Sequence, residues 1–351
     1  MDLKSALKEV LKIVPRKKEM EMFQRVHFVE GGGVLQNLVV GTDGVSTYVV
    51  RLDEDVHIRD GLYDSNVIRT AVRDGYNLRM ASAGSTAMLK TGSTEYILKK
   101  CNAKGFPALP VLPEAGEFKE IAVWKDIANV FFAADGKSAY PAVAFRDNYV
   151  LTADKAMLAR VEANCGLSGV AGIRCFKSWP RGDVAVSADS VFSYFRIGCD
   201  LYRITPFVDA GIPEVAADLA FDAASGLDFV ELDAGVFYNA VKQAAAFGEH
   251  GIISLQTAQG GVVVTGYKTD NSGVLTDQTY SAFVSYPELT DPSTLPCKDH
   301  MFFDGEHLTK ILKAVHTGVL QIGFGVGEKD PLVVRDNEFV YTALLWRMLV
   351  V

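Results

Sequence analysis

The stretch Leu3-Lys4-Ser5-Ala6-Leu7-Lys8-Glu9-Val10-Leu11-Lys12-Ile13-Val14 mixes apolar and charged residues with the period of a helix. Its apolar side chains recur every three or four positions, and its lysines recur every four positions on the other side. Pro15 follows directly and stops the helix. The chain therefore opens with an amphipathic helix that carries a stripe of lysines opposite its apolar face.

Alternating apolar segments follow this helix and indicate β-strands. Gly31-Gly32-Gly33 and Asp43-Gly44 separate them and are typical of hairpin turns. A second helix is expected at Asp64–Arg73, with Asp64 or Ser65 as its N-cap, before the unit closes at Phe106-Pro107. The expected strands are 26–29, 34–40, 47–52, 77–81, 87–91 and 96–100.

This pattern recurs twice, which indicates an internal repeat. The second unit has a helix at Val123–Ala133, a helical remnant at Lys155–Glu162 and only a weak helix signal in the glycine-rich segment Gly166–Asp183. The third has helices at Ala234–Phe247 and Gly305–Val315. The strands expected in these two units are 142–145, 149–152, 191–197, 200–206, 252–256, 262–267, 320–324, 332–334 and 340–346.

The length of the repeat sets the domain organisation. Ile212-Pro213 echoes Phe106-Pro107 at a spacing of 106 residues, and 351 residues are enough for about three domains of ordinary size. We expect an α+β fold of three domains, 1–115, 116–222 and 223–351, each with two helices packed on antiparallel sheets. Linkers are expected near 107–117 and 216–227.

Basic residues recur on the free faces of the predicted helices in all three units. Taken helix by helix, they are ordinary solvated charges; taken together, they are able to line a common surface, and their recurrence in all three units favours a functional role. The residues of this predicted basic surface are Lys4, Lys8, Lys12, Arg69, Arg73, Lys125, Lys242, Lys310 and Lys313.

Composition restricts the function classes. Hydrophobic residues make up 49% of the chain and the net charge is −8, so any contact with DNA has to be local. The apolar runs are shorter than the ~20 residues of a membrane span, and the first residues lack the apolar core of a signal peptide, so we expect a cytoplasmic protein without membrane contact. The five cysteines include no CxxC pair, and we expect neither disulfide nor metal nor cofactor.

Enzyme motifs are incomplete. Gly136-Lys137-Ser138 resembles the end of a phosphate-binding loop, but Phe131 stands where the first glycine is required. Gly323, Gly325 and Gly327 lie between predicted strands and favour a hairpin over a dinucleotide loop. The six histidines have no metal-binding spacing, and no serine lies in a GxSxG elbow. We therefore expect no enzyme.

The sequence resembles the beta subunit of bacterial DNA polymerase III, the sliding clamp, over its whole length. The most specific pieces are Gly41-Thr42-Asp43 running into 48–52, the run 91–98 continuing to Phe106-Pro107, Val208–Pro213 and Trp346-Arg347-Met348. The resemblance implies a non-enzymatic processivity factor that pairs head to tail into a homodimeric ring around duplex DNA. It also implies DNA polymerase and clamp loader as partners.

Clamps of this family bind partner peptides in a hydrophobic groove. The resemblance places it here on Ala153, Lys155, Ala156, Met157, Leu158, Pro213, His307, Leu344, Leu345, Trp346, Arg347 and Met348. Lys155-Ala156-Met157 replaces the family's Gly-His-Arg, and Ala217 stands where the family has an arginine. Three residues also follow Met348, so the choice of partner is open. In the competing interpretation, Leu344, Leu345 and Trp346 form an edge of the hydrophobic core and not a groove.

For the subunit interface, the resemblance places Tyr96 of one copy against Ala246 and Phe247 of another. Tyr96 and Phe247 as plain core residues is the alternative. Two other functions stay open at this stage: a protein-binding scaffold of the same fold that does not encircle DNA, and a hydrolase with its site on unaligned loops. A scaffold has no reason to keep a basic face in every unit, and no convergent set of catalytic groups supports the hydrolase.

Overall fold

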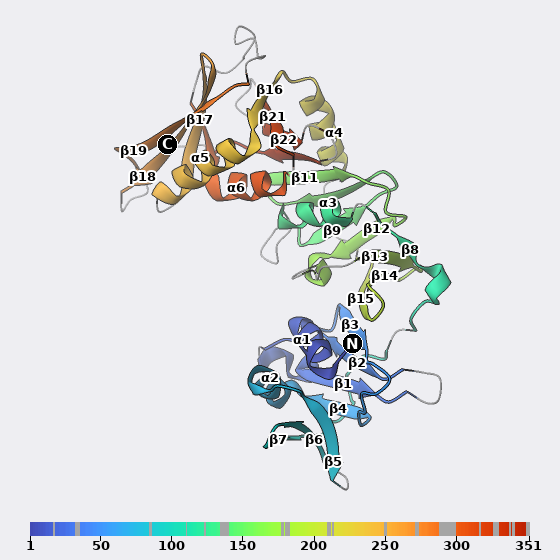
Figure 1. Cartoon of the computed structure of the whole chain (residues 1–351). Coiled ribbons are helices and arrows are strands. Elements are labelled where there is room, and N and C mark those ends of the chain that lie inside the picture. Colours follow the sequence, from blue (N-terminus) through green and yellow to red (C-terminus); the bar gives the residue numbers. More distant parts are fainter. Residues whose placement is uncertain are drawn as a thin grey trace. The chain divides into compact units, whose positions relative to one another are not determined.

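The computed structural model describes most of the chain. The described residues are 1–16, 18–31, 36–83, 86–109, 111–122, 124–133, 140–176, 179, 183–208, 212, 214–248, 251–270, 274–287, 300–315, 317–325, 330–336, 338 and 341–348. The chain forms two compact units (Figure 1). Unit 1 is Met1–Trp124 with Cys165–Asp209, and unit 2 is Lys125–Asn164 with Ala210–Val351.

The helices of unit 1 lie where the sequence predicts them. Helix α1 spans Leu3–Ile13 and α2 spans Ser65–Asp74. Each begins with an aspartate cap: Asp2 accepts a hydrogen bond from the Ser5 amide at 3.0 Å, and Asp64 accepts one from the Asn66 amide at 2.7 Å. The apolar face of α1 is buried, and the short helix η1 (Lys18–Phe23) follows it. The helical periodicity therefore predicts these elements correctly.

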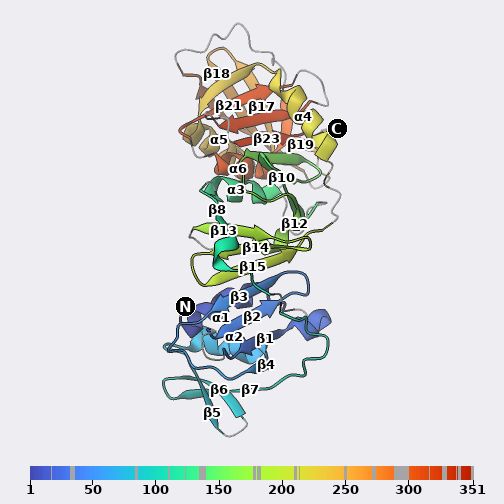
Figure 2. The same ribbon diagram turned by 90° about the vertical axis from the view of Figure 1, so that its right-hand side faces the viewer.

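One long antiparallel sheet organises unit 1. Its strand order is β4 (Gly61–Asp64), β1 (Arg25–Val29), β2 (Leu38–Thr42), β3 (Thr47–Arg51), β15 (Leu201–Pro206), β14 (Phe192–Ile197), β13 (Val184–Ala188) and β8 (Lys119–Glu120). A smaller sheet has the order β5 (Arg79–Ala83), β6 (Thr86–Thr91), β7 (Thr94–Leu98). Figure 2 looks onto β1, β2 and β3, with α1 and α2 behind them. Helices thus cover one face of the long sheet.

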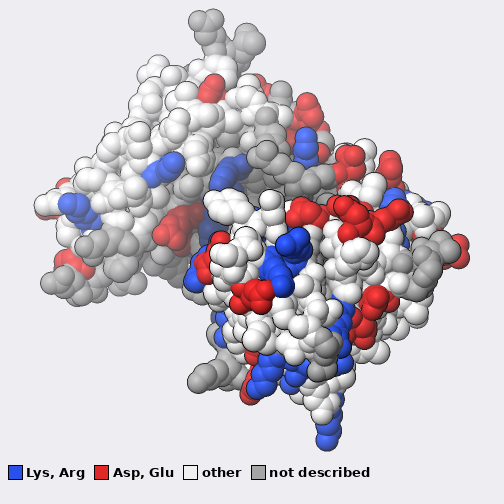
Figure 3. All heavy atoms as spheres, turned by 60° about the horizontal axis from the view of Figure 1, so that its bottom comes forward, with Lys and Arg blue, Asp and Glu red and all other residues white. Residues whose placement is uncertain are grey.

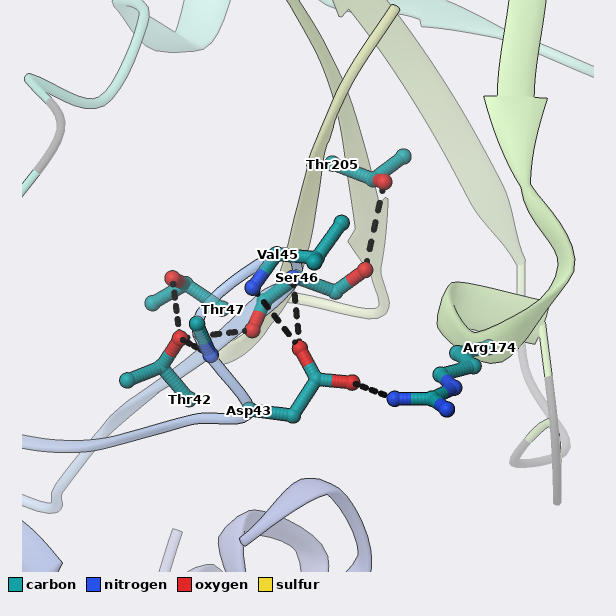
Figure 4. Close-up of polar contacts among 8 residues, drawn as sticks. Thr42, Asp43, Val45, Ser46, Thr47, Arg174 and Thr205 are labelled. Carbon is teal, nitrogen blue, oxygen red and sulfur yellow. Dashed lines mark hydrogen bonds and ion pairs between the residues drawn. The ribbon is translucent and has the colours of Figure 1, made fainter. Parts of the chain in front are cut away.

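The pairing of β3 with β15 joins the first predicted repeat to the second. Val50 pairs with Leu201 and Thr47 with Ile204. The hairpin before β3 strengthens this junction, because the Ser46 hydroxyl donates to Thr205 Oγ1 at 3.2 Å and the Arg174 guanidinium lies 3.5 Å from Asp43 Oδ2 (Figure 4). The residues of unit 1 after β8 also include β12 (Gly169–Gly172) and the single turn η4 (Ile173–Phe176), in agreement with the irregularity expected there.

Unit 2 contains a second long antiparallel sheet. It includes, in order, β9 (Ala142–Phe145), β10 (Tyr149–Ala153), β11 (Met157–Glu162), β23 (Tyr341–Leu345), β22 (Leu332–Asp336), β21 (Val319–Phe324) and β16 (Phe229–Asp233). A further sheet has the order β19 (Leu275–Ser285), β18 (Gly261–Thr269), β17 (Ile252–Ala258), β20 (Met301–Asp304). Here β11 and β23 join segments that are far apart in the sequence.

The helices of unit 2 are α3 (Trp124–Asn129) with the turn η3 (Val130–Ala133), α4 (Glu214–Ser225), α5 (Ala234–Phe247) and α6 (Gly305–Ala314). Both α5 and α6 match the predicted ranges almost residue by residue, since Asp233 and Asp304 cap them. The α+β fold is therefore confirmed, while the predicted domain boundaries stay predictions.

Two local predictions are wrong. Residues 157–162 form the strand β11, not a helical remnant, because β10 and β23 pair with this segment on both sides. Residues 214–225 form α4, where a linker was expected. Ala217, Phe221 and Ala224 are buried at helical spacing, so α4 has an apolar face that packs against the rest of unit 2.

Candidate nucleic-acid interface and partner-binding surfaces

Helices α1 and α2 lie side by side (Figure 1). Their side chains enclose a basic hollow of about 380 Å³. We call it the α1–α2 basic hollow. Five of the predicted basic residues meet there, together with Arg16, which the sequence analysis missed because it lies beyond Pro15, after the end of α1. The hollow is lined by Lys4, Lys8, Leu11, Lys12, Arg16, Arg69, Val72 and Arg73. Helical spacing on α1 and α2 thus brings five cations to one place, and Arg16 joins them from the segment after α1.

These cations differ in how they are held. Lys12 forms an ion pair with Glu9 at 2.6 Å, Arg73 forms one with Asp74 at 2.8 Å, and Lys4 donates to the Gly75 carbonyl. Lys8 and Arg16 are exposed to solvent. Several cations are therefore already engaged within the unit, while Lys8, Lys12, Arg16 and Arg73 are all exposed.

Arg69 has a structural contact that sequence alone does not indicate. Its guanidinium donates to the Leu11 carbonyl at 3.1 Å and to the Val14 carbonyl at 2.6 Å. These carbonyls belong to the C-terminal end of α1, where cations are favoured. Burial lowers the pKa of Arg69, and the nearby charge of Arg16 lowers it further. Arg69 thus fastens α2 to α1 within the hollow.

Three of the four predicted basic residues of unit 2 lie on α3 and α6, namely Lys125, Lys310 and Lys313. A second hollow, of about 420 Å³, is lined by Ala128, Asn129, Phe132, Lys310, Lys313 and Ala314. Lys125 is exposed on the same helix as Ala128, while Lys242 is exposed on α5 with its ammonium 5.7 Å from the Tyr238 ring.

On the end of the molecule that Figure 3 brings forward, Lys and Arg atoms gather towards the lower edge and Asp and Glu atoms form separate groups.

The predicted partner groove is brought together by the pairing of β11 with β23. Met157 pairs with Leu345 and Leu158 with Leu344, and the Trp346 amide donates to the Ala156 carbonyl at 3.0 Å. The fully buried residues of the predicted groove are Ala153, Met157, Leu158, Leu344 and Leu345. The partly or fully exposed ones are Lys155, Ala156, His307, Trp346, Arg347 and Met348. Pro213 lies outside the described residues.

Burial decides which of these residues can meet a peptide. Within the exposed set, Trp346, Arg347 and Met348 follow one another in the chain and are held in place, because the Met348 amide donates to the Phe302 carbonyl at 2.9 Å and Arg347 donates to the Gly325 carbonyl. The buried residues of the predicted groove lie on β10, β11 and β23 and form part of the sheet that carries the exposed ones. Contact with a peptide would therefore fall on the exposed set, and the assignment of the groove stays a prediction.

His307 lies in the first turn of α6 and is fixed by Asp304. The two side chains form an ion pair at 2.8 Å, and Asp304 also accepts hydrogen bonds from the Glu306 and His307 amides. Contact with the Asp304 carboxylate raises the pKa of His307, although its burial acts in the opposite direction. At neutral pH this makes His307 more cationic than a free histidine.

The predicted interface residues lie on exposed edges. Tyr96 is half-buried on β7, which ends its sheet, and the adjacent Ile97 is 66% exposed. Phe247, at the end of α5, lies 6.2 Å from the Tyr280 ring of β19, the last strand of its own sheet. Phe283 on β19 is 54% exposed. The sequence analysis missed Ile97 and Phe283, because strand alternation alone does not say which strand ends a sheet.

The remaining observations concern metal ligands, long apolar helices and cysteines in the part of the chain that the structure describes. Across the described ranges, no cluster of three or more His, Cys, Asp or Glu residues is arranged to hold a metal. Among the same residues, no helix combines the length and apolarity that a membrane crossing requires. Gly136-Lys137-Ser138 and Cys297 fall outside the described residues, and four other cysteines are free thiols.

Comparison with solved structures shows which known proteins have a similar fold. No protein-family model and no curated protein matches the sequence. The solved sliding clamp of Bacillus subtilis matches with a TM-score of 0.77 at 12% identity, covering 99% of this chain and 97% of that chain. The DNA polymerase III beta subunit of Thermotoga maritima matches with a TM-score of 0.76 at 14% identity, covering 100% of this chain and 98% of that chain.

A third similar structure is the Pseudomonas aeruginosa sliding clamp bound to griselimycin. Its TM-score is 0.76 at 15% identity, and the match covers 99% of this chain and 97% of that chain. The chain therefore has the α+β fold of bacterial sliding clamps from end to end. This confirms the resemblance on which the sequence analysis relied.

Proposed function

We propose that this chain is a DNA sliding clamp, a non-enzymatic processivity factor that encircles duplex DNA as a homodimeric ring. The observation that carries the proposal is the α1–α2 basic hollow, where six Lys and Arg side chains gather in a protein of net charge −8. Such a local concentration of cations attracts a polyanion, while the negative remainder of the surface repels it. Lys125, Lys242, Lys310 and Lys313 extend the proposed DNA-facing surface to unit 2.

The proposed mode of DNA binding is weak and independent of sequence. Lys12 and Arg73 already have carboxylate partners, and Arg69 is bonded to carbonyls of α1. Few cations are thus free for direct phosphate contacts, which carry no sequence information in any case. Closure of the ring, rather than affinity, retains the DNA in this proposal.

The proposal includes partners in the cytoplasm. A DNA polymerase and a clamp loader would bind the groove through its exposed residues, above all Trp346 and Met348. The Lys155-Ala156-Met157 segment, which departs from the family's pattern, would then set partner choice. No metal or cofactor takes part.

Retention on circular DNA tests encirclement. Labelled protein is loaded by a bacterial clamp loader onto nicked circular DNA, and the bound fraction is measured by gel filtration before and after the circle is linearised. We expect retention on the circle and loss from the linear form, because a ring slides off free ends. Equal retention on both forms contradicts encirclement and favours the scaffold alternative.

A matched pair of variants tests the basic hollow. K8A/R16A removes two exposed cations of the hollow, and K99A/K104A removes two exposed cations elsewhere in unit 1. Anisotropy with a short labelled duplex at several salt concentrations should show weaker binding by K8A/R16A and a salt slope smaller by about 1.8, at ~0.9 for each phosphate contact. K99A/K104A should bind like the unmodified chain; an equal loss in both variants rejects the hollow as the DNA contact.

A further inference from the structure

A hollow of about 720 Å³ lies in unit 1 away from the α1–α2 basic hollow. One side is the linker 111–117, and the other is the end of β13 with the turn that leads into β14. We call it the linker–turn hollow. Nothing in the proposed DNA contact, groove or subunit interface uses its residues.

Both walls of the linker–turn hollow are held in place. Leu112 of the linker and Phe192 of β14 pack against the buried cluster that contains Phe118 and Tyr194. In the turn that forms the second wall, Asp189 accepts hydrogen bonds from the Val191 and Phe192 amides at 2.7 Å and from the Tyr194 hydroxyl at 2.7 Å. The hollow is therefore a feature of the folded unit.

One wall presents an open backbone edge. Strand β8 pairs with β13 only at Ala185 and Val186 among the described residues. The Val184 carbonyl accepts from Ile121 on the β8 side, whereas the Asp183 carbonyl and the Asp189 amide bond on the β14 side. Because backbone groups alternate between the two sides of an antiparallel strand, those of Ala188 point to the β8 side, beyond the end of β8. An extended peptide is able to pair there.

The side chains around this edge select a particular kind of peptide. Glu114, Glu117 and Asp189 are exposed and acidic, and no Lys or Arg is among the described residues that line the hollow. Val111 is 88% exposed and Val191 is 52% exposed beside them. Carboxylates next to apolar side chains complement a segment that alternates basic and apolar residues.

We infer that the linker–turn hollow docks an extended segment of a partner protein in which Lys or Arg alternates with aliphatic residues. The segment adds to the sheet along β13 at Ala188. Its apolar side chains contact Val111 and Val191, and its basic side chains contact Glu114, Glu117 and Asp189. This contact lies on surfaces separate from the proposed DNA contact and groove, so it is a second route to partners.

A defined peptide tests the inference. The probe is fluorescein-labelled acetyl-Lys-Val-Lys-Val-Lys-Val-Lys-amide, titrated with the full chain and followed by anisotropy. E114K/E117K reverses two exposed charges of the hollow, and E54K/D55K reverses two exposed charges in another turn of unit 1. We expect E114K/E117K to weaken binding at least tenfold and E54K/D55K to leave it unchanged. Hydrogen exchange should slow at 187–192 when the peptide binds.

Each other outcome overturns the inference. Equal weakening by both double variants, or equal binding of the same peptide with Glu in place of Lys, would mean general attraction without a site. Normal binding by A188P, which removes one edge amide, would exclude strand addition. A change in sedimentation of E114K/E117K without peptide would assign the hollow to a second copy of this chain. DNA retention is measured in parallel, and E114K/E117K should load normally, so failure here is distinct from failure of the clamp proposal.

Discussion

The guanidinium of Arg203, which is fully buried, lies 4.4 Å from the centre of the Tyr48 ring. This contact joins β15 to β3, the two strands through which the first and second predicted repeats become one sheet. Arg203 also donates to the Cys175 carbonyl at 2.9 Å and lies 3.9 Å from Glu9 of α1. Burial, the largest influence, raises the pKa of Tyr48, so the phenol stays neutral beside this cation.

Replacing Arg203 should therefore destabilise unit 1. Arg203→Ala removes a fully buried side chain with its hydrogen bond to the Cys175 carbonyl and its contact with the Tyr48 ring, while Glu9 keeps its ion pair with Lys12, so we expect the free energy of unfolding to fall by about 3 kcal/mol. Arg203→Met keeps much of the volume and should cost less. Urea unfolding measures both. Arg174→Ala is the control, because its side chain is 58% exposed and its ion pair with Asp43 should contribute under about 1 kcal/mol. Equal losses for Arg203→Ala and Arg174→Ala contradict this account.

Gly41 sets how closely α1 approaches β2. A Cβ atom at this position would lie 2.5 Å from Val10 Cγ1 and 2.7 Å from Val14 Cγ2. Gly41→Ala should therefore force α1 away from the sheet and lower the free energy of unfolding by about 2 kcal/mol. Gly116→Ala adds the same methyl group where nothing lies within 4 Å, and should change it by less than about 0.5 kcal/mol. Thermal and urea unfolding of the two variants decide the matter; similar stabilities would show that the close approach is not limiting.

The sequence analysis succeeded where local signals determine an element and failed where pairing between distant segments determines it. Helices α5 and α6 are defined by local signals, namely an apolar face and an aspartate cap, and both were predicted. Strand β11 depends on Leu344 and Leu345, which are far away in the sequence. Because β10 and β23 pair with it on both sides, most of its residues are buried and its alternation is lost, so it resembled a helix.

The candidate surfaces show the same limit. Lysine spacing on α1 predicts the stripe, and the hollow confirms that these residues meet. The bonds of Arg69 to the carbonyls of Leu11 and Val14 could not be predicted, since they depend on how α2 packs against α1. The burial of Leu344 could not be predicted either, because it depends on pairing with Leu158, which is far away in the sequence.

His307 should make stability depend on pH. Its folded pKa is raised, so its contribution is complete below its ordinary pKa of about 6.5 and is lost as the pH rises through the folded value. The pKa of Asp304 is lowered by its contact with His307 and by amide hydrogen bonds, against the effect of burial. Its contribution is therefore present above about pH 4 and is lost on acidification through the lower folded value.

The melting temperature of His307→Gln tests this window. The difference from the unmodified chain should be largest between about pH 4 and 6.5 and should shrink as the pH rises through the folded pKa of His307. The charge of Lys310 lowers the pKa of His307 and the charge of Asp154 raises it, and the net shift stays upward. His57→Gln at an exposed position should give a small difference at every pH. A His307→Gln difference that is constant with pH would exclude the ion pair as its cause.

The proposed ring predicts a dimer that depends on two exposed edges. Phe247→Asp should give monomers in analytical ultracentrifugation, because a charge would be buried against the partner. Ile97→Asp is a second variant of the same interface, and its side chain is already 66% exposed, so the fold should not suffer. Val45→Asp, at a position 50% exposed in a turn, should leave the dimer intact. Persistence of the dimer in both interface variants would remove Tyr96, Ala246 and Phe247 from the interface.

Met348 provides the sharpest test of the groove. It is the most exposed apolar residue of the predicted set, at 37%, and its backbone is held by the bond from its amide to Phe302. Met348→Lys therefore changes what a peptide contacts without changing the buried floor of Leu344 and Leu345. A labelled clamp-binding peptide from a bacterial replicative polymerase should bind this variant at least tenfold more weakly, a loss of about 1.4 kcal/mol.

Met22→Lys is the matched control, because Met22 is 43% exposed in unit 1 and lies outside every proposed surface. If the two variants bind the peptide equally, the contact lies elsewhere. If neither the unmodified chain nor Met22→Lys binds it, the groove does not take this peptide, and Lys155-Ala156-Met157 becomes the first place to look for the reason. Lys155→Gly with Ala156→His would then be expected to restore binding, because Lys155 is exposed and Ala156 partly exposed beside Trp346, whereas Met157 is buried in the sheet.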